Sequence, residues 1–305
     1  MLRSARLAIA RSLTFALPAP AAEWSRGREA PAPRSEVGVA ETGGKAYVVG
    51  DYNGATELLI YDLAADSWRE GAAFPYHVHH PMTVATGGLV YVFGGYRDGW
   101  TATADVHAYD PGTDRWSRRS AMPGERAAGG AALLEGRIHI VGGSHSGRGN
   151  STGHLVYDPE KDRWSEAAAL PTPRDHLSVQ AVAGKLVAAG GRIDGESNRN
   201  LAVTEVYDPG ADAWIKAPDM PTARSGTASA VIDGEMVVLG GESRSQTYGA
   251  VEAFDPVRNA WRKLPDLPTP RHGFGAAVRD GHLFTLVGSP KPGGDRSGRV
   301  EILKP

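Results

Sequence analysis

Six tryptophans recur along the chain at intervals of 44, 48, 48, 50 and 47 residues, and no other feature limits the fold as strongly. Each is followed seven residues later by a proline. The tryptophans are Trp24, Trp68, Trp116, Trp164, Trp214 and Trp261, and the prolines are Pro31, Pro75, Pro123, Pro171, Pro221 and Pro268. A unit that repeats about every 40 to 50 residues is typical of solenoids and propellers.

Strand signals within each repeat favour the propeller. In the fourth repeat, Ser178–Val182 and Lys185–Ala189 flank a short turn and form a predicted hairpin that ends at Gly190-Gly191. A third strand is expected over Val203–Tyr207 and a fourth around Trp214. The repeats show no sustained 3.6-residue periodicity, which argues against helices. Four short antiparallel strands per repeat predict an all-β, six-bladed propeller.

The two ends of the chain are complementary. The last repeat offers strands over Gly273–Arg279, Leu283–Val287 and Arg299–Leu303 but no fourth strand with a tryptophan. Trp24, in turn, precedes any complete repeat. We therefore expect the N-terminal strand around Trp24 to close the last blade, which leaves no open sheet edge at the seam.

The motif within one repeat resembles the kelch repeat. It consists of a glycine pair, a Tyr-Asp-Pro turn, a tryptophan and a Leu-Pro pair, as in Gly142-Gly143, Tyr157-Asp158-Pro159, Trp164 and Leu170-Pro171. This resemblance covers residues 24–305 and implies a six-bladed β-propeller around a central channel. It implies no single function, because kelch propellers serve as protein-interaction modules, as sugar-acid mutarotases and as copper radical oxidases. The chain resembles secreted kelch proteins of the bacterial type, and it is more distantly similar to the sugar-acid mutarotases.

Composition excludes several classes of protein. The chain has 305 residues, a formal net charge of −2 and no cysteine. Without cysteine there is no disulfide, no cysteine-ligated metal and none of the cysteine–tyrosine cross-link that the copper radical oxidases need. The near-neutral charge argues against a nucleic-acid partner. Outside the N-terminus no stretch approaches the roughly 18 apolar residues of a membrane span.

The first 22 residues differ in character from the repeats. They contain Arg3, Arg6 and Arg11 but no acidic residue, and they end with Ala19-Pro20-Ala21. This pattern predicts a signal peptide, with a transit peptide or a disordered leader as the alternative. We therefore expect a leader over 1–22, a propeller over 23–305, and a secreted or periplasmic monomer. A cytoplasmic location is the alternative.

Arginine recurs three residues after the repeat proline in five of six repeats, while Val78 occupies the remaining copy. Pseudo-symmetry would bring these side chains into a ring at one mouth of the channel, where guanidinium groups could bind a carboxylate or phosphate. Alternatively, each arginine pairs with a neighbouring carboxylate or carbonyl and ties the blades together. The five residues are Arg34, Arg126, Arg174, Arg224 and Arg271.

Histidines occupy neighbouring positions of alternate repeats. His79 and His80 align with Asp175 and His176, and His272 aligns with His79. If they converge, they form a metal site, a polar ligand pocket, or hydrogen bonds between blades. The spacing matches no known metal motif, so no metal ion or cofactor is assigned.

The residue after each glycine pair also varies, and Tyr96, Arg192 and Glu242 are candidate ligand contacts. Trp100, outside the repeat register, is a candidate platform for a sugar ring or a partner side chain. The favoured interpretation is a binding module for a protein or for a carbohydrate or other anionic small molecule. The alternative is a sugar-acid mutarotase, for which His80, His176 and Glu242 are weak catalytic candidates.

Overall fold

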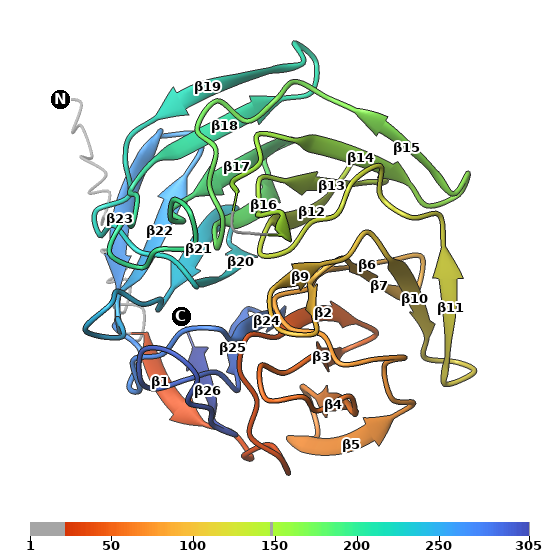
Figure 1. Ribbon diagram of the computed structural model, residues 1–305. Coiled ribbons are helices and arrows are strands. Elements are labelled where there is room, and N and C mark those ends of the chain that lie inside the picture. Colours follow the sequence, from red (N-terminus) through yellow and green to blue (C-terminus); the bar gives the residue numbers. More distant parts are fainter. Residues whose placement is uncertain (1–21, 147–148, 305) are drawn as a thin grey trace, which may run out of the picture.

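Six four-stranded antiparallel sheets surround a central channel in the computed structural model, which describes residues 22–146 and 149–304 (Figure 1). The predicted all-β, six-bladed propeller is confirmed. The leader expected over 1–22 lies outside the described residues except for Ala22. Within the described ranges there is no apolar helix of membrane-spanning length.

The strands run in chain order from the channel outward in each of the first five blades. The first three blades comprise β2 (Gly38–Thr42), β3 (Lys45–Val49), β4 (Leu58–Asp62), β5 (Ser67–Gly71); β6 (Met82–Thr86), β7 (Leu89–Phe93), β10 (Val106–Asp110), β11 (Arg115–Arg119); and β12 (Gly130–Leu134), β13 (Arg137–Val141), β14 (His154–Asp158), β15 (Arg163–Glu166). The next two comprise β16 (Ser178–Val182), β17 (Lys185–Ala189), β18 (Thr204–Asp208), β19 (Ala213–Ala217); and β20 (Ala228–Ile232), β21 (Glu235–Leu239), β22 (Val251–Asp255), β23 (Ala260–Leu264). A small hairpin of β8 (Tyr96–Arg97) and β9 (Thr101–Ala102) lies in the segment that connects β7 to β10 of the second blade.

The sixth blade joins the two ends of the chain. It contains β24 (Gly275–Arg279), β25 (His282–Leu286) and β26 (Val300–Lys304) from the C-terminus, and β1 (Glu23–Arg26) from the N-terminus (Figure 1). Trp24 of β1 lies opposite Leu303 of β26. The predicted closure is therefore correct, and the seam is hydrogen-bonded like the other blades.

The signature tryptophans connect neighbouring blades. Each indole N–H donates to a backbone carbonyl of the preceding blade at 2.8–3.0 Å, as Trp116 does to Ala72. The glycine pairs permit close approach of backbones. A Cβ on Gly94, whose φ is +55°, would lie 2.0 Å from the carbonyl oxygen of Arg126 in the next blade. Only glycine fits both the conformation and the space.

A belt of backbone hydrogen bonds surrounds the channel at the start of the innermost strands. The residue five positions after each repeat proline has a φ of +52° to +65°, and in five of the six repeats its N–H donates to the equivalent carbonyl of the preceding blade. The five donor–acceptor distances are 2.7–3.1 Å, and Val37 completes the circuit to Gly273 at 3.5 Å. The belt residues are Glu36, His80, Ala128, His176, Gly226 and Gly273. Their backbones hold the ring together and leave their side chains available at the channel axis.

Candidate functional site

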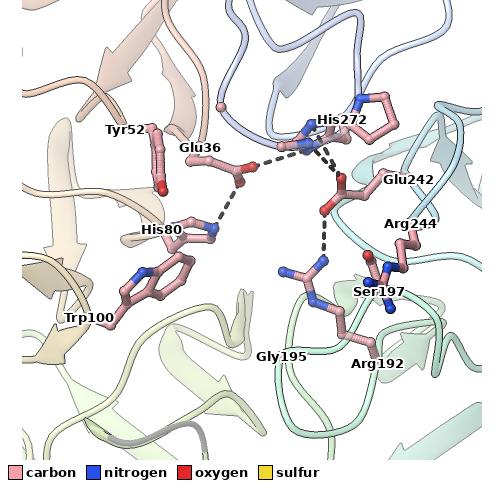
Figure 2. A pocket seen from close by; sticks show the side chains of 13 residues that line it. Glu36, Tyr52, His80, Trp100, Arg192, Gly195, Ser197, Glu242, Arg244 and His272 are labelled. Carbon is pink, nitrogen blue, oxygen red and sulfur yellow. Dashed lines mark hydrogen bonds and ion pairs between the residues drawn. The ribbon is translucent and has the colours of Figure 1, made fainter.

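A pocket of about 340 Å³ lies over the belt, bounded by loops that follow the second strands of five blades (Figure 2). Its floor includes Glu36 and His80 of the belt together with His272. The remaining lining residues are Tyr52, Trp100, Arg192, Gly195, Ser197, Glu242, Arg244, Pro292, Gly293 and Gly294. Below the floor, a narrower space of about 90 Å³ continues into the channel past His176.

Alternating charges connect the floor to one wall of the pocket. Glu36 lies 3.0 Å from Nε2 of His80 and 3.0 Å from Nδ1 of His272. Nε2 of His272 in turn lies 3.5 Å from Glu242, which accepts a 2.7 Å hydrogen bond from Arg192 (Figure 2). All five side chains are buried, so these ion pairs are weakly screened by solvent.

The electrostatics favour a carboxylate and an imidazolium on the pocket floor. Burial acts to raise the pKa of Glu36, but His80 and His272 outweigh it and hold this pKa well below its usual value. Burial acts to lower the pKa of His272, whereas Glu36 and Glu242 raise it above its usual value. Glu36 is therefore ionised at neutral pH, and the two carboxylates stabilise the protonated form of His272.

His176 has the opposite character. Its burial, together with the nearby Arg192, lowers its pKa to about 4, so the ring is neutral at neutral pH. Its Nδ1–H donates to Asp175, while Nε2 accepts a 2.8 Å hydrogen bond from Arg192. Burial opposes ionisation of Asp175, but His176 and Arg192 lower its pKa to about 2.

His79 and His80 form a directional hydrogen-bond chain. Nε2 of His79 donates to the carbonyl of Gly99 at 2.7 Å, which leaves its Nδ1 to accept from Nδ1 of His80 at 2.6 Å. Burial lowers the pKa of His79 to about 3, consistent with a neutral ring. Nε2 of His80 is thereby directed at Glu36.

Aromatic rings form the opposite wall. Tyr52 and Trp100 lie 6.1 Å apart between ring centroids, and each keeps more than a third of its surface exposed. Behind them, Tyr96 is buried, with its ring centroid 5.0 Å from that of Trp100 and 5.6 Å from that of His80. Tyr96 therefore supports the wall without lining the pocket.

The repeated arginines do not form the expected ring at the mouth. Arg174, Arg224 and Arg271 are completely buried within their blades, and each pairs with a glutamate on the third strand. The glutamates are Glu205, Glu252 and Glu301. These contacts correct the interpretation of the three arginines as ligand contacts, because their charge is already neutralised within the blade.

Arg34 and Arg126 are also buried away from the pocket. Arg34 pairs with Glu57 at 3.1 Å. In the blade of Arg126 the third-strand position equivalent to Glu205 is Leu155, and Arg126 donates to the carbonyl of Gly142 at 2.7 Å. Burial without a carboxylate lowers the pKa of Arg126 to about 10. Both arginines support their blades, which corrects their assignment to the site.

The chain resembles a protein-family model in sequence and a solved structure in fold. The model of the KLHDC2/KLHL20/DRC7 Kelch-repeats domain matches residues 80–288. The chain belongs to the kelch-repeat family. A solved structure of a protein named YjhT is similar with a TM-score of 0.79 at 18% identity, covering 89% of this chain and 95% of that one. At this identity the likeness shows the shared fold alone. No curated protein matches the sequence significantly.

The sequence analysis of this kelch propeller did not identify Glu36, the third-strand glutamates or Arg244. Glu36 lies five residues after Pro31, at the same offset as His80 and His176, so the repeat alignment contained the signal for it. Two of the three third-strand glutamates, Glu205 and Glu252, lie three residues before the recurrent aspartate, and Glu301 occupies the equivalent position in the last repeat, which has Lys304 in place of that aspartate. Arg244 had no such signal, because it lies in a loop whose length varies between repeats.

Proposed function

We propose that the pocket binds a small, polyhydroxylated ligand that carries a carboxylate, such as a sugar acid. The single observation that supports this best is the contrast between its two walls. Tyr52 and Trp100 offer exposed ring surface on one side, whereas Arg244 and Glu242 offer charged groups on the other. Aromatic stacking against the apolar face of a sugar, with polar groups at its hydroxyls, is a common mode of recognition.

The dimensions favour a small molecule over a protein segment. A volume of about 340 Å³ is near the lower end of the range for small-molecule pockets, which is roughly 300–1,000 Å³. Arg244 is exposed at the rim, and no ion pair joins it to a carboxylate in the part of the chain that the structure describes. Its guanidinium group is thus available for a ligand carboxylate in the bidentate geometry that arginine favours.

Isothermal titration with a panel of acidic and neutral monosaccharides tests this proposal. We expect an acidic sugar to bind and Arg244→Met to remove the preference for it over its neutral analogue. Trp100→Ala is expected to weaken both, because stacking is indifferent to the carboxylate. Arg258→Met changes an exposed arginine in the turn between β22 and β23 and serves as the matched control. Equal affinity of the wild type for acidic and neutral sugars would refute the role of the carboxylate.

Ring opening of the bound sugar is a second candidate function. It is supported by Glu242 and His80, which both line the pocket. A carboxylate base can remove the proton of the anomeric hydroxyl while an imidazole acid protonates the ring oxygen, so that the bond between the anomeric carbon and the ring oxygen breaks. His176 is less suited, because it does not line this pocket and borders only the narrower space below the floor. Exchange between anomers, followed by NMR, should be faster with the wild type than with Glu242→Gln. If the wild type binds the sugar without accelerating exchange, catalysis is excluded and binding is retained.

We propose that residues 1–22 direct export of the protein from the cytoplasm. The arginines of this segment, its lack of acidic residues and its small residues near Ala21 support this location. Mass spectrometry of the protein recovered from a periplasmic or extracellular fraction should show an N-terminus near residues 22–23. Recovery only in the cytoplasm with Met1 intact would contradict it.

A further inference from the structure

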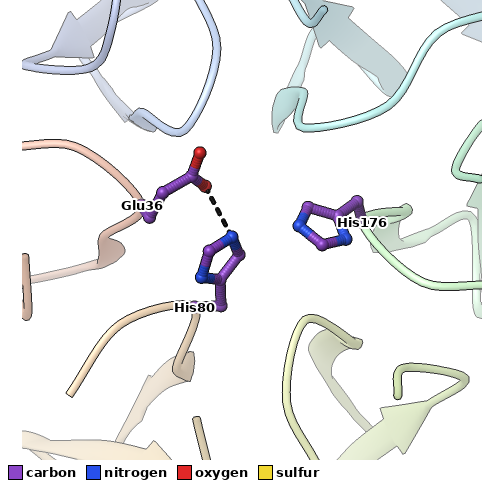
Figure 3. Close-up of side chains that lie close together, drawn as sticks. All are labelled: Glu36, His80 and His176. Atoms are coloured by element: carbon purple, nitrogen blue, oxygen red, sulfur yellow. Dashed lines mark ion pairs between the residues drawn. The ribbon is translucent and has the colours of Figure 1, made fainter. Parts of the chain in front are cut away.

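Three belt positions carry ligating side chains that meet at the channel axis. Glu36, His80 and His176 come from three different repeats, all are buried, and one ligand atom from each lies within 4.8 Å of the others (Figure 3). Their φ values of 53–54° belong to a conformation that favours glycine, which occupies two of the remaining belt positions. Retaining non-glycine residues in such a conformation costs about 1 kcal/mol each or more, and strain of this kind clusters at functional sites.

Both histidines are held at one nitrogen and directed inward with the other. Nδ1–H of His176 donates to the carboxylate of Asp175, and Nδ1–H of His80 donates to Nδ1 of His79. This outer layer of acceptors fixes the tautomer that leaves each Nε2 for the axis. A histidine that binds a metal ion almost always donates its other N–H to a carboxylate, a backbone carbonyl or water, and the pair of His176 with Asp175 has this arrangement.

We propose that Glu36, His80 and His176 form a binding site for a divalent transition metal ion, with Zn²⁺ as its simplest occupant. Two imidazole nitrogens and one carboxylate oxygen are a donor set that suits zinc and other first-row metals. The three protein ligands leave further coordination positions for water or a ligand oxygen. Glu36 and His80 also line the pocket above, and all three residues line the narrower space below, so the site lies between the two.

The distances require only a modest rearrangement. Zinc–ligand bonds of about 2.0–2.2 Å place neighbouring donor atoms roughly 3.0–3.5 Å apart. Glu36 and Nε2 of His80 already lie 3.0 Å apart, so His176 is the ligand that must move inward. In the structure, Arg192 donates to Nε2 of His176. Arg192 therefore competes with the metal ion for the same lone pair, and it remains paired with Glu242 when it yields that position.

If Arg192 competes with the metal ion, loss of a histidine ligand and loss of Arg192 should change the Zn²⁺ affinity in opposite directions. Titration calorimetry of the chelator-treated full chain with Zn²⁺ alone measures both affinities. We expect one equivalent of Zn²⁺ to bind the wild type. His176→Gly and His80→Gly should each weaken binding by more than about 100-fold, beyond the 10- to 100-fold loss that outer-layer changes such as Asp175→Asn produce. Arg192→Met should strengthen binding, since it frees Nε2 of His176 and removes a nearby positive charge.

Glycine is chosen at both positions because Gly226 and Gly273 adopt the same backbone conformation in this belt, so folding is preserved. Thermal unfolding of each variant verifies this, and either glycine variant alone decides the outcome if the other unfolds. His282→Ala, at the start of β25, controls for binding by a histidine outside the site. The absence of saturable Zn²⁺ binding, unchanged affinity in His176→Gly, or weaker binding in Arg192→Met would each overturn the proposal. No sugar is present, so the result is independent of the proposed carbohydrate ligand.

Discussion

The buried pair of Arg224 and Glu252 provides the sharpest test of how the blades are held together. Both side chains are at most 1% exposed. Thr222 also donates to Glu252 at 2.7 Å, and Arg224 donates to the carbonyls of Thr222 and Val238 at 3.0 Å each. Glu252→Gln keeps the shape but leaves the guanidinium charge without a counter-charge. Removing one partner of a buried ion pair costs about 3–5 kcal/mol.

Thermal unfolding followed by circular dichroism measures this cost. At about 2–4 °C per kcal/mol for larger domains, we expect the Tm of Glu252→Gln to fall by roughly 10 °C. Replacing both partners, as Arg224→Met with Glu252→Leu, should recover most of the loss, because no charge is then buried alone. The second blade already forms with Val78 and His107 at the equivalent positions.

An exposed pair supplies the control for this experiment. Arg258 pairs with Asp255 but is 81% exposed, so Arg258→Met should change stability by less than about 1 kcal/mol. The reasoning is refuted if Glu252→Gln unfolds at the wild-type temperature. It is also refuted if the double apolar variant is no more stable than Glu252→Gln.

Three further perturbations address the seam, acid stability and the belt. Deleting residues 22–30 removes β1 and should lower the Tm of the whole ring; an unchanged Tm would contradict closure by this strand. Burial lowers the pKa values of His139 and His154 to about 4, so their stabilising contribution is present above the unfolded-state pKa near 6.5 and is lost as pH falls from there toward 4. Introducing the residues of the fourth blade, as His139→Val with His154→Thr, should reduce the loss of unfolding free energy between pH 7 and 4 by about 6 kcal/mol, about 3 kcal/mol for each histidine, whereas an unaltered pH profile would exclude this cause. Ala128→Gly should be neutral or stabilise by up to about 1 kcal/mol because φ is +52°, whereas Ala132→Gly, inside β12, should destabilise by a similar amount in denaturant titrations.

The repeat pattern determined the architecture because each signature residue has a local task that recurs in every blade. The strands predicted over Ser178–Val182 and Lys185–Ala189 coincide with β16 and β17, and the N-terminal strand lies in the blade assigned to it. Turns, glycine pairs and tryptophans act over short distances or between adjacent blades, so their spacing alone specified them.

The site was only partly predictable because its chemistry depends on partners far apart in the sequence. Pseudo-symmetry correctly aligned His80 with His176, whose ring centroids lie 4.7 Å apart. The same argument predicted that Arg174 lies at the channel mouth. In the structure, Arg174 is instead buried inside its blade and pairs with Glu205, a residue 31 positions away. A charge at a repeated position could serve either a ligand or the blade, and only the location of its counter-charge distinguishes the two.

The belt also determines where this scaffold accepts new chemistry. Since its hydrogen bonds use backbone atoms alone, a side chain added at a belt position need not disturb them. Gly273 has no room, because a Cβ there would lie 2.6 Å from the carboxyl carbon of Glu36. At Gly226 the nearest atom to an added Cβ is 3.4 Å away, in His272, so a larger residue fits at the cost of its φ of +65°. A redesign that seeks an additional functional group on the channel axis should therefore begin at Gly226.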